Sequence, residues 1–145
     1  MCGPCRPREG TDSMASALYP RFKQGLLSKE HDVHEGGDTV KAMISNADQN
    51  TANTAYADVS SQLIGAAVTL ANRTVTNGVF DAEDISFTGL SSTDTAHGII
   101  LYNDTPTTPV AKPLMVYIDI TNTDMTGVTT LTITWQNTSP YIFTL

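Results

Sequence analysis

Charge is scarce in this 145-residue chain, and basic charge is the scarcer kind. Charged residues make up 16%, with 8 Lys and Arg against 15 Asp and Glu, so the formal net charge is −7. A chain this acidic is repelled by phosphate backbones, and its few basic residues do not cluster, so we expect no nucleic-acid partner. No apolar run approaches the roughly 20 residues that span a bilayer, so we expect no membrane partner either.

Cysteine is nearly absent. The two that occur, Cys2 and Cys5, form a CxxC within residues 1–13, a stretch rich in Gly, Pro and charge. A redox CxxC needs a strand before it and a helix after it, and a structural zinc site needs two further ligands. Neither accompanies this motif. We therefore interpret residues 1–13 as a disordered leader, or a misread start ahead of Met14, without a secretory signal.

Patterns that mark catalysis or cofactor binding are also missing. The chain has three His, and it contains no GxSxG, no P-loop and no dinucleotide fingerprint. Two weaker patterns remain open. His31, His34 and Glu35 suggest a metal site or a solvated loop, and the acidic cluster Asp81, Glu83 and Asp84 suggests weak Ca²⁺ binding or a turn. We favour the loop and the turn, and expect a non-enzymatic protein with no cofactor.

What the chain does contain is Thr in alternation with apolar residues. In residues 129–136, TTLTITWQ, Leu131, Ile133 and Trp135 alternate with threonines, and Trp135 is the single Trp. A period of two with β-branched residues predicts a strand with one apolar and one hydroxyl face. We expect a central antiparallel strand, paired with a strand at residues 114–120.

Other short segments show the same strand chemistry between turn signals. The clearest hairpin is formed by residues 74–80, where Asn77-Gly78 supplies the two positive-φ positions of a type I′ turn. In residues 38–45, Val40, Ala42 and Ile44 are predicted to face one way and Lys41 and Met43 the other. Further strands are predicted at residues 66–70, 85–87, 96–102 and 141–145.

One helix is predicted, within residues 14–29, where Leu18, Phe22 and Leu26 are spaced four apart. Pro20 suits only a first turn, so a start near Tyr19 is the alternative. About seven short strands with turns between them predict an all-β fold, an antiparallel β-sandwich with an N-terminal helix or arm. We divide the chain into residues 1–13, the arm and loop 14–36, and the β-sandwich 37–145.

Several segments carry a family resemblance: MASALYPRFKQGLLS at 14–28, TVTNGVFDAEDISFTGLS at 74–91, GIILYND at 98–104, LMVYIDI at 114–120 and LTITWQNTSPYIFTL at 131–145. In these the chain resembles small tailed-bacteriophage virion structural proteins. The likeness covers nearly all of residues 14–145 and is weakest over residues 28–70. It includes no catalytic residues.

The resemblance implies assembly rather than catalysis. The leading expectation is a capsid decoration or cement protein on the outside of the head shell, with the major capsid protein or other virion proteins as partners. The chain would then be located in the virion after assembly in the bacterial cytoplasm, as a homo-oligomer, for which we expect a trimer. The alternatives are a neck, collar, tail or fibre component, and a receptor- or carbohydrate-binding module. The candidate interface residues, which could equally be core residues, are Leu18, Tyr19, Phe22, Tyr141 and Phe143.

Overall fold

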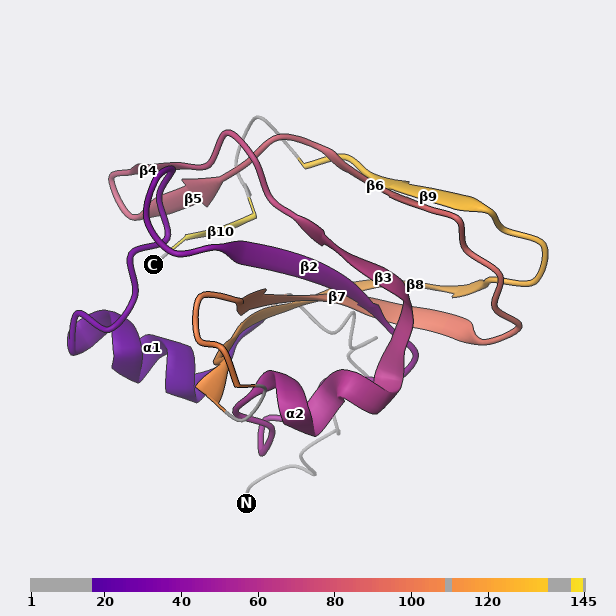
Figure 1. Cartoon of the computed structure of the whole chain (residues 1–145), viewed down its shortest axis with the longest axis horizontal. Coiled ribbons are helices and arrows are strands. Elements are labelled where there is room, and N and C mark those ends of the chain that lie inside the picture. The colour runs from indigo at the N-terminus through magenta and orange to yellow at the C-terminus, as the bar shows by residue number, and fades with distance from the viewer. Residues whose placement is uncertain (1–16, 109–110, 136–141, 145) are drawn as a thin grey trace, which may run out of the picture.

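A computed structural model describes residues 17–108, 111–135 and 142–144. Over these residues the chain is mostly β, with antiparallel sheets and only short helices, which confirms the predicted all-β sandwich class. The main layer is a five-stranded sheet in the order β1-β8-β7-β2-β3 (Figure 1). Its strands are β1 (Ala17–Leu18), β8 (Leu114–Asp124), β7 (Thr95–Asn103), β2 (Val40–Ser45) and β3 (Leu63–Thr69).

Two smaller sheets form the layer drawn above the main sheet in Figure 1. One has the order β10-β5-β4 and the other pairs β6 with β9. Each pairing in the described part of the chain is antiparallel. The bounds are β4 (Thr74–Thr76), β5 (Val79–Asp81), β6 (Ile85–Thr88), β9 (Thr130–Ile133) and β10 (Phe143–Thr144).

Apolar residues fill both faces of the main sheet, as the alternation in β2 predicts. Val40, Ala42 and Ile44 belong to the larger core cluster, together with residues of the upper layer such as Phe80 and Phe87. Met43 belongs to a second cluster on the opposite face. The middle of the five-stranded sheet is therefore covered on both sides, because successive side chains of a strand point to opposite faces.

The helices are short. Helix α1 (Pro20–Leu27) begins with Pro20 in its first turn, so the later of the two predicted starts is the observed one. The prediction was wrong for Leu18, which lies in β1 rather than on a helical face. Helix α2 (Tyr56–Val59) continues into the 3₁₀ turn η1 (Ser60–Gln62), and Val59 covers the second cluster.

The predicted hairpin forms between β4 and β5. Asn77 has φ 51° and Gly78 has φ 80°, as a type I′ turn requires, and Thr76 pairs with Val79 across it. The geometry of this turn depends only on the two residues at its tip. That is why it could be predicted without knowing any long-range contact.

Two predictions about β9 were wrong. The strand is not central, and its partner is β6 rather than β8, with Phe87 opposite Leu131 and Ser86 opposite Thr132. Strand β8 instead pairs with β7 on one side and β1 on the other. The predicted alternation itself is present, because Leu131 and Ile133 are half-buried while the threonines between them are exposed. Alternation determines which face is wet, but not which strand lies alongside.

Candidate functional site

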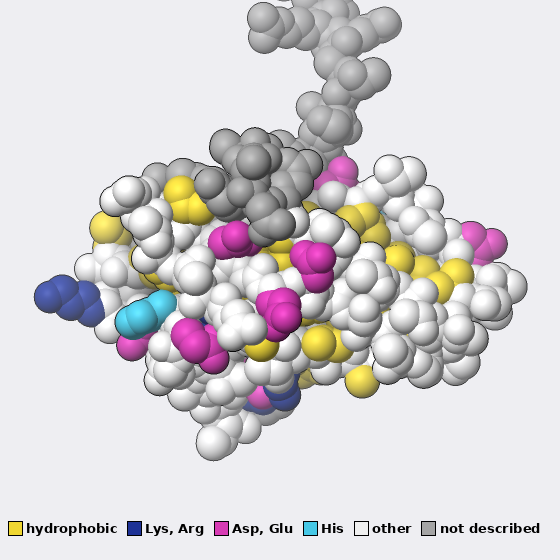
Figure 2. All heavy atoms as spheres, turned by 90° about the horizontal axis from the view of Figure 1, so that it is seen from above, with side chains coloured by type: hydrophobic (Ala, Val, Ile, Leu, Met, Phe, Trp, Pro, Cys, Tyr) yellow, Lys and Arg dark blue, Asp and Glu magenta, His cyan; other side chains and the backbone are white. Residues whose placement is uncertain are grey.

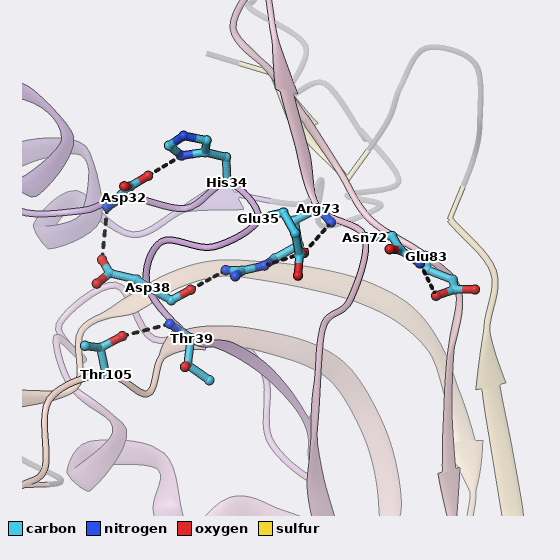
Figure 3. A network of polar contacts seen from close by, with 9 residues as sticks. All are labelled: Asp32, His34, Glu35, Asp38, Thr39, Asn72, Arg73, Glu83 and Thr105. Atoms are coloured by element: carbon cyan, nitrogen blue, oxygen red, sulfur yellow. Dashed lines mark hydrogen bonds and ion pairs between the residues drawn. The ribbon is translucent and has the colours of Figure 1, made fainter.

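A buried arginine fastens the loop that follows α1 to the connection between β3 and β4. Arg73 is 7% exposed. Its guanidinium Nη1 donates a hydrogen bond to the backbone carbonyl of Asp38, and its backbone N–H donates to Glu35 Oε2 at 2.9 Å (Figure 3). The guanidinium Nε lies 3.6 Å from the same Glu35 carboxylate. The guanidinium is thus held inside the fold, where its positive charge is balanced by the Glu35 carboxylate.

Carboxylates gather on the outer side of the upper layer, while Lys and Arg side chains show only toward its margins (Figure 2). Glu83 accepts a hydrogen bond from Asn72 Nδ2 at 2.8 Å, next to the Arg73 clamp. Because Arg73 is buried, the exposed carboxylates face water with little opposing charge. We call this surface, around the exposed Glu35 and Glu83 on the two sides of the Asn72–Arg73 segment, the acidic face.

The carboxylates of the predicted calcium cluster accept separate hydrogen bonds. Asp81 Oδ1 accepts the N–H of Ala82 at 3.0 Å, whereas Asp84 Oδ1 accepts the N–H of Trp135 at 2.9 Å. The Trp135 indole N–H donates to the Glu83 carbonyl at 2.9 Å. This segment therefore acts as a turn that anchors the end of β9. A calcium site would need these oxygens to converge on one point.

The predicted His31, His34 and Glu35 group diverges in the structure. The ring of His31 stacks on Phe22 with centroids 5.3 Å apart, while His34 pairs with Asp32 and Glu35 contacts Arg73. Burial lowers the pKa of His31, and the nearby Arg21 lowers it further, although Asp38 and Glu30 act in the opposite direction. Within the described ranges, no three His, Cys, Asp or Glu side chains are placed to hold a metal ion together.

A polar hollow of about 290 Å³ lies beside His31. Its charged groups are already paired: Arg21 contacts Glu30 at 2.6 Å, and Asp38 Oδ2 accepts a hydrogen bond from Asn103 Nδ2 at 2.7 Å. Asn103 is itself buried. A buried amide bonded to a carboxylate fits a structural role, because unpaired polar groups are costly inside a protein.

Most of the candidate contact residues lie in the core. Tyr19 and Phe22 are fully buried, Phe143 is 9% exposed and Leu18 is half-buried. The rings of Phe22 and Phe143 meet edge to face at 5.8 Å, and Phe143 stacks on Phe80 at 4.8 Å. Core packing, the alternative left open by the sequence, describes Tyr19, Phe22 and Phe143. Tyr141 lies outside the described residues.

The exposed apolar side chains and the strand edges are the surfaces that the sequence did not single out. Leu27 on α1 is 89% exposed and Val75 on β4 is 45% exposed. Among the described residues, no strand pairs with the outer edge of β4, with the outer edge of β9, or with β8 beyond Tyr117. Unpaired edges offer backbone donors and acceptors to another strand.

Comparison with protein-family models, with curated proteins and with solved structures finds no match to this chain. No helix in the described part of the chain is long and apolar enough to cross a membrane.

Sequence reasoning missed Arg73, Asp38 and Asn103, the residues that hold the polar network together. Arg73 lies 35 residues from the carbonyl that it contacts, and Asn103 lies 65 residues from Asp38. No local spacing could have indicated these pairs. The only hint in the sequence was that basic residues are scarce. In such a chain, an individual arginine such as Arg73 is a candidate for a specific ion pair or hydrogen bond.

Proposed function

We propose that this chain is a non-enzymatic bacteriophage virion structural protein, a capsid decoration protein that binds the outside of the head shell and stabilises it. The observation that carries the proposal is the acidic face, taken together with the resemblance of residues 14–145 to small virion proteins. The acidic face lies on the upper sheet layer, and the Arg73 beside it is buried and contacts Glu35.

Electrostatics supports a protein partner with a basic surface. Exposed carboxylates attract a positively charged patch and are repelled by packaged nucleic acid, so a protein of this charge binds the shell without competing for DNA. The positive charge of Arg73 is buried and lies next to the Glu35 carboxylate, so it offsets little of the negative potential of this surface. A basic patch on the major capsid protein is the partner that this charge pattern fits.

Strand edges add a second means of attachment. The outer edges of β4 and β9 are unpaired among the described residues, and both carry exposed threonines. An extended segment of a neighbouring virion protein can add to such an edge through backbone hydrogen bonds. A small domain that joins adjacent subunits in this way resists the outward pressure of packaged DNA.

The decisive experiment is a density map of the intact particle, with the copy number measured by quantitative mass spectrometry. Decoration of the head shell predicts hundreds of copies on the outer surface, arranged as a homo-oligomer for which we propose a trimer. A few tens of copies or fewer at the neck, collar, tail or fibre would replace the decoration role by one of those positions. Particles that lack the polypeptide would end the proposal altogether.

Charge variants test the binding surface directly. The single substitutions Glu35→Gln and Glu83→Gln each remove one exposed carboxylate charge. Each should weaken binding to shells at low salt and make the binding less dependent on salt. Asp119→Asn is the matched control, since it removes one charge from β8 in the other layer. Equal weakening by the control would show that net charge, not this face, governs binding. Specific binding in a glycan-array screen would instead favour a carbohydrate-binding module.

A further inference from the structure

Helix α1 presents an exposed apolar side chain between two exposed cations. Phe22 and Gly25 are buried on its inner side. Lys23 and Leu27 lie four residues apart on the opposite face and are exposed, Leu27 to 89%. Lys29 is exposed just beyond the helix. We call Lys23, Leu27 and Lys29 the α1 patch. Neither of its lysines forms an ion pair with a described residue.

The described cations gather at one end of the main sheet. The start of β2, the end of β7 and the start of β8 meet there, because these strands are antiparallel neighbours. Helix α1 lies beside the same end, since the Tyr19 N–H donates to the Met115 carbonyl at 2.9 Å (Figure 1). Four of the six described cations are held in ion pairs with described carboxylates, which leaves the two lysines of the α1 patch. The six are Arg21, Lys23, Lys29, Lys41, Arg73 and Lys112.

The opposite end of the main sheet carries aspartates. Asp94 precedes β7 and Asp124 ends β8, and they are neighbours because Thr95 pairs with Asp124. Both aspartates are exposed. The sequence contains no Lys or Arg from residue 74 to 111 or from 113 to 145, and His97, near this end, pairs with Asp48 at 2.8 Å. We call Asp94 and Asp124 the aspartate end, a surface whose charge is opposite to that of the α1 patch.

The two surfaces cannot attract each other within one molecule. Strand β8 has 11 residues, and a strand rises about 3.3 Å per residue, so roughly 30 Å separates the two ends of the sheet. The Debye length is only about 8–10 Å at physiological ionic strength, so this attraction is screened. A second copy removes the separation, because every copy carries both surfaces. The aspartate end also offers an apolar contact for Leu27, since Val128 beside it is half-buried.

We propose that the α1 patch of one copy docks on the aspartate end of a second copy, with its two lysines paired to the two aspartates and Leu27 packed over Val128. The contact joins two different surfaces, so it closes into a ring where the rotation between copies allows and otherwise continues as a chain. It is small, hence weak in solution, and it strengthens where copies are already held side by side. It needs no shell, so it is tested apart from the proposed function.

Sedimentation equilibrium of the full chain at low salt, over a range of protein concentrations, measures the contact. The double variant Asp94→Asn, Asp124→Asn removes both charges and keeps oxygen acceptors for the Asn46 amide and the Thr126 N–H, which lie at 3.2 and 2.8 Å in the parent. We expect its self-association to be roughly fivefold weaker or more. General repulsion predicts the opposite sign, because this variant is less negative than the parent. Leu27→Ala should weaken self-association roughly tenfold with no change in charge.

Mixing two variants tests the head-to-tail geometry. A protein with Lys23→Glu and Lys29→Glu keeps the aspartate end, whereas the double Asn variant keeps the α1 patch. Each should associate weakly alone, and an equimolar mixture should form a heterodimer with the parent affinity through the one intact pair of surfaces. The matched control, Glu35→Gln with Glu83→Gln, removes two charges from the acidic face and should leave self-association at the parent strength. Urea unfolding followed by Trp135 fluorescence shows that each variant is folded.

Four results would overturn the proposal. The parent chain could stay monomeric at low salt up to about 1 mM, which would mean that the two surfaces do not bind. The double Asn variant could associate as strongly as the parent, which would exclude the aspartate end. The mixture could form no heterodimer, which would mean that α1 contacts another α1 or a different surface. Weakening in the Glu35→Gln, Glu83→Gln control would place the contact on the acidic face instead.

Discussion

Phe22 offers the sharpest test of whether the N-terminal aromatic residues serve the core or a partner. The side chain is fully buried on α1, where it meets Phe143 edge to face at 5.8 Å and His31 at 5.3 Å. Replacing it with alanine removes the ring and leaves a cavity that the surrounding sheets cannot fully close. We therefore expect Phe22→Ala to destabilise the fold strongly.

The expected cost follows from burial and from the aromatic contact. Truncating a buried Phe to Ala costs about 3–5 kcal/mol, a large share of the roughly 5–15 kcal/mol that stabilises a typical domain. The edge-to-face contact contributes roughly 0.5–1.5 kcal/mol of that. For a chain of this length, the melting temperature should fall by roughly 10 °C or more. A double-mutant cycle with Phe143→Ala should show coupling of about 1 kcal/mol.

Urea unfolding followed by the fluorescence of Trp135 measures the change directly. Trp135 is the single Trp and is 6% exposed, so its emission reports on the core. The control is Leu27→Ala on the same helix, where the side chain is 89% exposed and the change should stay within about 0.5 kcal/mol. If Phe22→Ala unfolded at the parent urea concentration while failing to bind particles, Phe22 would be a contact residue and the packing argument would be wrong.

Three further predictions concern the polar network, the buried histidine and the hairpin. Arg73→Met should cost about 2–3 kcal/mol in urea unfolding, because it leaves the partly buried carbonyl of Asp38 without its donor; a cost under about 0.5 kcal/mol would show that the clamp is not needed. Burial lowers the pKa of His31 in the folded state, so the unfolded state takes up its proton first as the pH falls through about 6.5, and the free energy of unfolding should decrease from pH 7 toward pH 5. His31→Gln should flatten that slope, and an unchanged slope in His31→Gln would refute the assignment. Gly78→Ala should cost about 1 kcal/mol by the same assay, since Gly78 has φ 80° in the type I′ turn; a neutral result would mean that the turn changes type without loss.

Local chemistry explains what the sequence could predict. The hairpin depends on the backbone freedom of Asn77 and Gly78, and the two faces of β2 depend on the alternation around Met43. Each of these is determined by residues within one short segment. The two-residue strand β1 has no such signal, because its partner Tyr117 is 100 positions away from Ala17. Likewise, the clamp between Arg73 and Asp38 exists only after β2, β3 and the preceding loop are in place.

The pairing partner of β9 was mispredicted, although the alternation of apolar residues and threonines in β9 explains the observed partner. Residues Leu114–Tyr117 of β8 are buried on both faces, because the main sheet has an apolar cluster on each side. A strand with exposed threonines on one face would leave hydroxyls in one of those clusters if it lay inside that sheet, at a cost of a few kcal/mol for each unpaired group. Strand β9 fits instead beside a strand whose solvent-exposed face lies on the same side of the sheet. Strand β6 shows that alternation, and Ser86 and Thr132 bond across the pair at 2.8 Å. The choice of partner therefore follows from matching wet faces between strands, a comparison of whole patterns rather than of neighbours in the sequence.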